Sequence, residues 1–167
     1  MSYYVIIRGP LGCGKSTVAE KLANQLGAKY YSMDGILDEH GLTRDKEEGY
    51  ISQQSFITAN EIAAPEANNL LKYGMPVVFD GNFYWASQIE DLMERLNYPH
   101  QVFTLKASLD TCIKRDGARK KKYGIDAVRA VYKKSIEFDY GIGIDTENKT
   151  AEETVKRILT HLPPRKR

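Results

Sequence analysis

The residues most suggestive of chemistry lie near the start of the chain, where glycines, a lysine and a serine follow a fixed spacing. Residues 9–17 read Gly-Pro-Leu-Gly-Cys-Gly-Lys-Ser-Thr, with four residues between Gly9 and the triplet Gly14-Lys15-Ser16. Glycines permit positive φ and a close approach of backbone to ligand, so successive N–H groups can point at phosphate oxygens. In this pattern the lysine reaches the β- and γ-phosphates and the serine hydroxyl holds Mg²⁺. The segment predicts a binding site for ATP or GTP.

The residues on either side of this loop fit the same interpretation. Residues 3–7 are apolar and predict a buried strand, and residues 17–26 have apolar side chains at helical spacing. The N-terminus of a helix after a glycine loop adds free N–H donors and a partial positive charge. A plain glycine turn is the alternative, but the agreement of the motif with the strand before it and the helix after it disfavours that alternative. The predicted nucleotide-binding residues of the loop are Gly9, Gly12, Cys13, Gly14, Lys15, Ser16 and Thr17.

Two aspartates follow predicted strands. Asp80 ends the apolar run 77–79, where it can hold Mg²⁺ through a water or face the acceptor of the phosphoryl group. Asp34 follows the strand predicted over 28–33, where it can orient or deprotonate an acceptor hydroxyl. Each aspartate precedes a glycine, so a turn-forming or helix-capping role is the alternative. The neighbouring phosphate loop favours the functional role for both.

The most basic segment spans residues 114–122 and contains Arg115 and Arg119, four residues apart on one helical face. Guanidinium groups suit stacking on a base and bidentate contact with phosphate. Gly117 favours mobility, because glycine inside a helix costs about 1 kcal/mol relative to alanine. We therefore predict a lid at about residues 114–124 that shields the transferring phosphoryl group from water. A solvated helix face, or a grip on nucleic acid, is the alternative.

The stretch between the second and third predicted strands is expected to cover the acceptor. Arg44 lies in it and can bind an anionic part of the acceptor, or can be an exposed surface arginine. With Asp34 and Asp80 it completes the predicted acceptor site. Phe83, Tyr84 and Trp85 can wall this pocket or belong to the core.

Strand and helix patterns alternate along the whole chain. Strands are predicted over residues 3–7, 28–33, 77–79, 101–105 and 142–144. Helices are predicted over residues 17–26, 50–71, 85–96, 109–121, 126–138 and 150–162, with Pro65 expected to interrupt or kink the second. Ser108 and the pair Thr150 and Glu153 are expected to cap helices. Such alternation predicts an α/β fold with a doubly wound, five-stranded parallel sheet between two helical layers.

Ligands of such sheets bind outside the carboxyl ends of the strands. This rule places Asp145 and Thr146, after the fifth strand, at the ligand-binding edge of the sheet. We expect residues 1–162 to form one domain, followed by a basic tail at 163–167.

Composition narrows the class of protein. The net charge of +2 is too small to indicate nucleic acid by itself, and no apolar run has the length of a membrane span. The start of the chain lacks the pattern of a secretion signal. Only two cysteines occur, Cys13 and Cys112, and neither suggests a disulfide framework, so we expect a cytoplasmic protein.

Taken together, these residues resemble the small kinases of the phosphate-loop superfamily. The similar group contains polynucleotide 5′-hydroxyl kinase domains, zeta-toxin-like and chloramphenicol-type phosphotransferases, and shikimate and gluconate kinases. The resemblance spans nearly the whole chain and rests on the loop Gly9 to Thr17, on Asp34 and Asp80, on the pair Arg115 and Arg119, and on Asp145-Thr146 before the last helix. By this resemblance, Asp145 and Thr146 would belong to the nucleotide site.

The resemblance implies roles for particular residues. Lys15 and Ser16 would bind phosphate and Mg²⁺, and Asp34 would engage the acceptor hydroxyl, often as a base. Arg115 would lie on the adenine and Arg119 on the phosphates, which makes Lys15, Asp34 and Arg119 the candidate catalytic residues. The chain differs from nucleoside monophosphate kinases in its short lid and in lacking their arginine-rich monophosphate site, and it has no shikimate or gluconate signature.

The sequence supports two classes of function. The first is an ATP- and Mg²⁺-dependent phosphotransferase that moves the γ-phosphoryl group to a hydroxyl of a small molecule, a nucleoside or a polynucleotide end. The second is a nucleotide-binding switch or regulatory ATPase without a small-molecule acceptor, for which no water-positioning residue is evident. The identity of the acceptor, the choice of ATP or GTP and the oligomeric state stay open.

Overall fold

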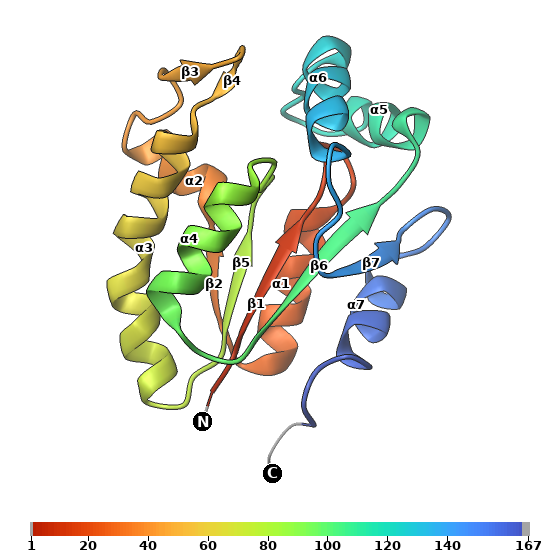
Figure 1. Ribbon diagram of the computed structural model, residues 1–167. Helices are drawn as coiled ribbons and strands as arrows, with labels where there is room; N and C mark the ends of the chain where they lie inside the picture. Colours follow the sequence, from red (N-terminus) through yellow and green to blue (C-terminus); the bar gives the residue numbers. More distant parts are fainter. Residues whose placement is uncertain (1, 165–167) are drawn as a thin grey trace.

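The computed structural model of the chain describes residues 2–164, and its centre is a parallel sheet of five strands (Figure 1). The strands are β1 (Tyr4–Arg8), β2 (Lys29–Ser32), β5 (Val77–Asp80), β6 (His100–Lys106) and β7 (Ile142–Asp145). Their order across the sheet is β2-β5-β1-β6-β7, and every neighbouring pair is parallel. The predicted fold class and all five predicted strands are confirmed.

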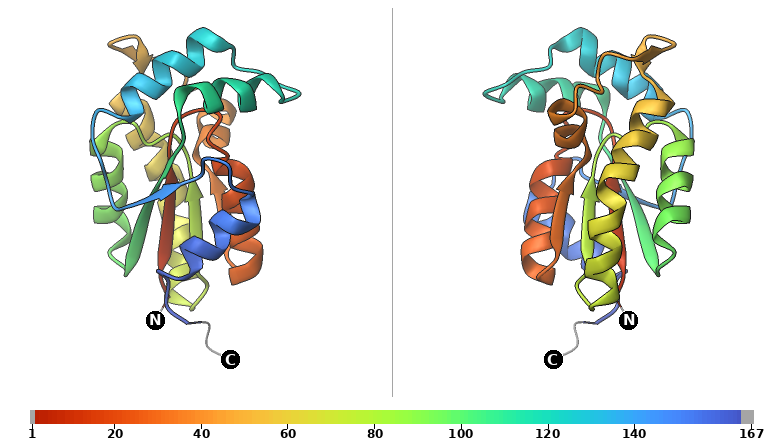
Figure 2. Two further views of the ribbon diagram at one scale, coloured as in Figure 1. Left: turned by 90° about the vertical axis from the view of Figure 1, so that its right-hand side faces the viewer. Right: turned by 90° about the vertical axis from the view of Figure 1, so that its left-hand side faces the viewer.

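Helices cover both faces of this sheet (Figures 1 and 2). On one face lie α1 (Lys15–Leu26) and α7 (Ala151–Leu159), and on the other lie α2 (Met33–Glu39), α3 (Gln53–Lys72) and α4 (Ala86–Leu96). Side chains of β1 alternate between the two cores: Val5 and Ile7 pack with α1 and α7, whereas Tyr4 and Ile6 pack with α3 and α4. The central strand is therefore buried on both sides, as expected of a parallel sheet.

Two further helices, α5 (Leu109–Gly117) and α6 (Ile125–Ser135), lie over the carboxyl ends of the strands (Figure 2). The first was predicted to reach about residue 121 but ends at Gly117, and Asp116 supplies a reason. Its buried carboxylate accepts hydrogen bonds from the backbone N–H groups of Tyr123 and Gly124, both at 3.0 Å. These bonds pull the chain back towards α5 and close the loop 118–124 into a tight connection to α6.

The region between β2 and α3 differs from the prediction. Residues 33–39 form α2, and a small antiparallel hairpin follows, made of β3 (Lys46–Glu47) and β4 (Tyr50–Ile51). Residues 50 and 51 were predicted to begin a helix, but that helix starts at Gln53, where the Ser52 side chain accepts a hydrogen bond from Ser55 N. Two-residue strands carry no detectable alternation, so sequence pattern could not reveal this hairpin.

Pro65 does not interrupt α3, which runs without a break from Gln53 to Lys72. The proline removes one backbone donor, but tertiary contacts outweigh that loss. The side-chain amide of Asn60 donates to Gln88 O at 2.9 Å, and that of Asn68 donates to Arg95 O at 3.0 Å, so both ends of the proline turn are tied to α4.

The remaining predictions concern helix caps and the ends of the chain. Ser108 caps α5, and Thr150 and Glu153 form a complete capping box at α7, as predicted. In the predicted basic tail, Arg165, Lys166 and Arg167 lie outside the described residues. Within residues 2–164, no helix combines the length and hydrophobicity needed to cross a membrane.

Arg8, which sequence analysis did not single out, is fully buried at the end of β1. It donates hydrogen bonds to Phe83 O at 3.1 Å, to Thr104 Oγ1 at 3.0 Å and to Ser135 O at 3.2 Å. Its guanidinium carbon lies 4.4 Å from the centre of the Phe138 ring, and burial lowers its pKa to about 10. One side chain thus joins the central strand to β6, to the loop after β5 and to the end of α6.

We expect Arg8→Met to reduce the free energy of unfolding by about 3 kcal/mol, because it leaves buried acceptors without donors. Urea unfolding measures the change. The matched control is Arg129→Met, which removes an exposed arginine from α6 and is expected to change stability by less than about 0.5 kcal/mol. Equal stability of the two variants would contradict a structural role for Arg8.

Candidate active site

The phosphate loop leaves β1 and enters α1 through two glycines whose backbone no other residue adopts easily. Gly12 has a φ of 80°, and a Cβ at this position would lie 2.3 Å from the carbonyl oxygen of Cys112 in α5. Gly14 has a φ of 90° and forms the N-cap of α1. Two constraints therefore favour glycine in this loop: the positive φ values of Gly12 and Gly14, and the direct contact of Gly12 with α5.

Lys15 is the first residue of α1, and its side chain is folded back over the loop. Its ammonium group donates to Pro10 O at 3.0 Å, and the residue is only 7% exposed. It lines a cavity of about 320 Å³ at the loop. Other predicted residues that line this cavity are Gly12, Gly14, Ser16, Thr17, Asp34, Arg115 and Arg119. The structure thus brings the predicted phosphate-binding and lid residues around one space.

The predicted metal-binding pair, Ser16 and Asp80, is joined by a residue that sequence analysis missed. Asp80 is buried at the end of β5 and accepts a hydrogen bond of 2.5 Å from the Tyr30 hydroxyl. Burial and the carboxylate of Asp80 raise the pKa of Tyr30, and a hydrogen bond with Ser16 partly offsets them. Hydroxyl and carboxylate oxygens are ligands that Mg²⁺ prefers, so Ser16 and Asp80 form a fitting donor set next to the phosphate loop.

Arg115 lies between the phosphate loop and the end of β7. Its guanidinium donates to Cys13 O at 3.3 Å, to Thr146 Oγ1 at 3.0 Å and to Thr146 O at 2.8 Å. A hollow of about 200 Å³ opens beside these groups and is also lined by Lys149. Asp145 is turned away from this hollow: its carboxylate accepts from Glu147 N at 2.9 Å and lies 3.7 Å from Lys149 Nζ.

Arg119 lies in the loop after α5 and, like Arg115, lines the cavity at the phosphate loop. Its guanidinium carbon lies 4.9 Å from the centre of the Tyr123 ring, and both residues line the cavity with Lys15. Tyr123 is half exposed. The sequence indicated only that it lies next to Gly124 at the end of a predicted helix, which gave no sign of a position at the cavity. The lid therefore presents two guanidinium groups, those of Arg115 and Arg119, and the aromatic ring of Tyr123 to the phosphate-binding space.

Asp34 occupies the first turn of α2, where Ser32 caps the helix by accepting from Gly35 N at 3.1 Å. Burial is the main cause that raises the pKa of Asp34 to about 6, with Asp80 and Asp38 adding to the shift and Lys15 and Arg119 opposing it. A carboxylate that titrates near neutral pH is suited to accept a proton during a reaction.

A second and larger cavity, of about 580 Å³, adjoins the first. Asp34, Leu11 and Tyr123 line both cavities, so Asp34 stands at their border. The larger cavity is bounded by α2, the β3-β4 hairpin, the loop after β5 and α6. Tyr84 lines it as predicted, whereas Phe83 is a fully buried core residue and Trp85 donates to Ile51 O at 2.7 Å.

The structure does not bring Arg44 to this site. Arg44 is exposed in the loop between α2 and β3, and the residues of that region that line the larger cavity are Thr43 and Lys46. Asp80 likewise does not line the larger cavity but remains with Tyr30 and Ser16. Of the three predicted acceptor residues, Asp34 alone faces this space.

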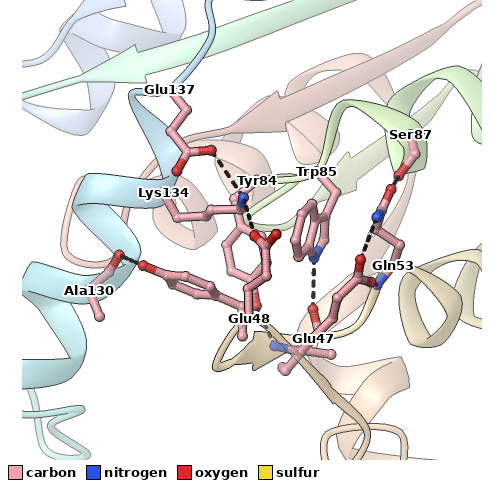
Figure 3. A network of polar contacts seen from close by, with 11 residues as sticks. Glu47, Glu48, Gln53, Tyr84, Trp85, Ser87, Ala130, Lys134 and Glu137 are labelled. Carbon is pink, nitrogen blue, oxygen red and sulfur yellow. Dashed lines mark hydrogen bonds and ion pairs between the residues drawn. The ribbon is translucent and has the colours of Figure 1, made fainter.

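Polar contacts fasten the hairpin to α6 and to the start of α4 (Figure 3). The Tyr50 hydroxyl donates to Ala130 O at 2.8 Å, and the Tyr84 hydroxyl accepts from Ile51 N at 3.1 Å. Lys134 is buried, with its Nζ 3.8 Å from the centre of the Trp85 ring, 3.0 Å from Glu137 and 3.8 Å from Glu48. Helix α6 and the hairpin are thus joined beside the larger cavity, which both of them line.

The strand order, the phosphate loop and the helical lid define the fold of a small phosphate-loop kinase. The chain belongs to the AAA_33 family, described as an AAA domain, which it matches over residues 5–138. It is also 28% identical over 166 residues to a Pyrococcus furiosus protein named "Putative adenylate kinase", and covers 81% of that protein with 93% of its own length.

Solved structures of two named kinases and of a tunicamycin resistance protein have a similar fold. A gluconokinase from Sinorhizobium meliloti 1021 superposes with a TM-score of 0.74 at 15% identity, covering 94% of this chain and 89% of that one. A shikimate kinase from Acinetobacter baumannii, in complex with shikimate, gives 0.60 at 22% identity, covering 96% and 91%. A tunicamycin resistance protein from Deinococcus radiodurans gives 0.68 at 17% identity, covering 98% and 100%.

We expect Asp34→Asn to stabilise the protein at neutral pH and to have little effect below pH 4. The pKa of Asp34 is about 6 in the folded chain, above the value of about 4 expected when it is unfolded. Ionisation therefore costs the folded state stability as pH rises from 4 to 6, and the penalty persists above pH 6.

Urea unfolding at pH 4 and pH 7 measures this effect, with an expected gain of about 2 kcal/mol for Asp34→Asn at pH 7. The matched control, Asp110→Asn, removes an exposed carboxylate from α5 and is expected to show no such pH-dependent gain. A variant that is no more stable than the wild type at pH 7 would refute the raised pKa.

Proposed function

We propose that the protein is an ATP-dependent phosphotransferase that moves the γ-phosphoryl group to a hydroxyl of an acceptor bound in the larger cavity. The observation that carries the proposal is the position of Asp34. Its carboxylate lines both cavities, and it interacts electrostatically with Lys15 on one side and with Asp38 on the other. A base at the border of a phosphate site and a second cavity is the arrangement that phosphoryl transfer to a hydroxyl requires.

Each predicted residue has a defined part in this proposal. The loop N–H groups and Lys15 would bind the β- and γ-phosphates, and Arg119 would neutralise charge that develops on the transferring group. Arg115 and Thr146 would border the adenine beside the smaller hollow. Ser16 and Asp80 would hold Mg²⁺, which supplies charge neutralisation at the phosphates when it is bound.

The proposed chemistry is a single displacement. The acceptor oxygen forms a bond to the γ-phosphorus, the bond from that phosphorus to the β–γ bridging oxygen breaks, and ADP leaves with the electron pair. The hydroxyl proton passes to the Asp34 carboxylate. The enclosure of the site by α5, α6 and the hairpin favours transfer to the acceptor over transfer to water.

The names of the similar proteins support phosphoryl transfer as the class of reaction, but they point to different kinds of acceptor. The solved structures named gluconokinase and shikimate kinase favour a hydroxyl acceptor, whereas the Pyrococcus furiosus relative named "Putative adenylate kinase" favours an adenine nucleotide. A nucleotide-dependent switch is less well supported, because it has no use for a second cavity of about 580 Å³ beside Asp34, which offers room for an acceptor.

We expect Lys15→Met to reduce phosphoryl transfer by about two orders of magnitude or more, because a preorganised charge on the phosphates is lost. Transfer from radiolabelled ATP to a broad panel of nucleosides, sugars and oligonucleotides measures the change. Lys21→Met, a surface variant on the same helix, is the control and is expected to keep wild-type activity. Wild-type transfer by Lys15→Met would rule out the proposed nucleotide site.

We expect Asp34→Asn to lower kcat about 100-fold or more while the Kd for Mg-ATP, measured by calorimetry, changes less than about threefold. In the wild type, kcat/KM should fall below pH 6 with the slope of a single proton, since the Asp34 pKa is about 6 and the base must be ionised. Equal losses of binding and transfer in Asp34→Asn would indicate that Asp34 is structural.

A further inference from the structure

The larger cavity is lined by more acidic than basic side chains. Among the described residues that line it, three carry carboxylates, Asp34, Asp38 and Glu48, and one carries an ammonium group, Lys46. Arg44, which lies between the lining residues Asp38 and Lys46 in sequence, is exposed and does not line the cavity. The buried Lys134 lies 3.8 Å from Glu48 and offsets its charge, which leaves Asp34 and Asp38 against Lys46 in the lining. An acceptor with a carboxylate or phosphate group would therefore meet a small excess of negative charge in this cavity, and no arginine among its described lining residues would bind it.

Apolar side chains also line the cavity. They include Leu37, Ile51, Val131 and the ring of Tyr84. The Tyr84 ring is held edge-on by Phe56, with ring centres 5.2 Å apart, and by Tyr50, with centres 5.5 Å apart. A rigid aromatic face of this kind suits a flat or ring-shaped part of a ligand.

Asn82 provides a polar group for recognition. It follows β5, is 8% exposed and lines the cavity. Its buried Oδ1 atom has no hydrogen-bond partner among the described residues. A buried acceptor without a donor costs free energy, so a ligand O–H or N–H group that supplies the donor is favoured. Because this oxygen has almost no accessible surface, a ligand O–H or N–H group would reach it after a rotation of the Asn82 side chain towards the cavity.

From these three observations we infer that the acceptor is a ring-bearing hydroxyl compound without acidic groups, of the size of a nucleoside or an amino sugar. The inference rests on the proposed phosphotransferase function and names the substrate class of that same site. The cavity volume of about 580 Å³ lies in the range that holds such compounds. Nucleoside monophosphates, sugar acids and polynucleotide ends bring negative charge to the carboxylate-lined wall and are disfavoured.

Matched compounds test the inference directly. We would measure transfer from radiolabelled ATP to adenosine and AMP, to thymidine and its monophosphate, to glucosamine, glucose and gluconate, and to an oligodeoxynucleotide with a free 5′-hydroxyl. In the sets that yield product, kcat/KM for the member without an acidic group is expected to exceed that of its acidic partner at least tenfold. Preference for AMP, gluconate or the oligonucleotide would overturn the inference.

Binding separates a wrong acceptor class from a wrong reaction. Trp85 is the only tryptophan of the chain, and its indole donates to the cavity residue Ile51, so its fluorescence reports on this wall. Binding of uncharged or amino compounds without phosphoryl transfer would refute the proposed function and support the acceptor class. Tighter binding of the acidic members, or no binding of any non-acidic member at 10 mM concentration, would overturn the inference.

Variants of the lining charge provide a second test. Asp38→Lys reverses a charge at the cavity and is expected to shift the ratio of acidic to uncharged acceptor kcat/KM about tenfold towards the acidic member. Glu90→Lys makes the same change on the exposed face of α4 and is expected to leave that ratio unchanged. Equal ratios in the two variants would show that cavity charge does not select the acceptor.

Variants of Asn82 test the buried oxygen. Asn82→Leu is expected to raise the KM of the best acceptor about tenfold and to leave the KM of ATP unchanged. Asn82→Asp keeps an acceptor oxygen in place and is expected to restore much of the lost affinity. Loss of ATP affinity in Asn82→Leu, or failure of Asn82→Asp to restore acceptor affinity, would contradict a recognition role for this residue.

Discussion

The arrangement of the site depends on one constraint: five parallel strands deliver their carboxyl ends to the same edge of the sheet. Because β1 is central, the phosphate loop after it lies between the residues that follow β5 and those that follow β6 and β7. Asp80 on one side and Thr146 on the other are far from the loop in sequence, yet both end strands of the same edge. The burial of β1 on both faces fixes this geometry, since a shift in its register would misalign two hydrophobic cores.

The two aspartates that the sheet brings to this edge, Asp80 and Asp34, have different surroundings. Asp80 accepts a hydrogen bond of 2.5 Å from the Tyr30 hydroxyl. Asp34 lines both cavities, and burial raises its pKa to about 6. Two aspartates at neighbouring strand ends therefore differ in kind, one suited to hold a cation and the other to exchange a proton.

Sequence pattern predicted the parts of this molecule whose physics is local. Gly12 and Gly14 predict the phosphate loop because glycine adopts their positive φ most easily. Thr150 and Glu153 predict the capped start of a helix, because their spacing is that of a capping box. Sequence pattern could not predict contacts between residues that are far apart along the chain. Arg8 and Tyr30 lie in strands and have no sequence feature that reveals their partners, which are 50 or more positions away.

The acceptor side shows the same limit. The charge of Arg44 predicted a place at the acceptor, but its side chain is exposed and does not line the cavity. Lys46 and Glu48 line it instead, and the β3-β4 hairpin that places them there is too short to show a periodic sequence pattern. Lys134 was likewise hidden in a helix that reads as amphipathic, although it is buried against Trp85. Residues whose function depends on tertiary packing become visible only in three dimensions.

The contact between Gly12 and the carbonyl of Cys112 has a consequence for motion. A backbone oxygen wedged against the loop, together with the bond from Arg115 to Cys13 O, anchors α5 to the nucleotide side of the molecule. A rigid-body swing of α5 would require both contacts to separate. Opening of the larger cavity between α6 and the hairpin would break a different contact, the bond from the Tyr50 hydroxyl to Ala130 O, and would leave α5 joined to the phosphate loop.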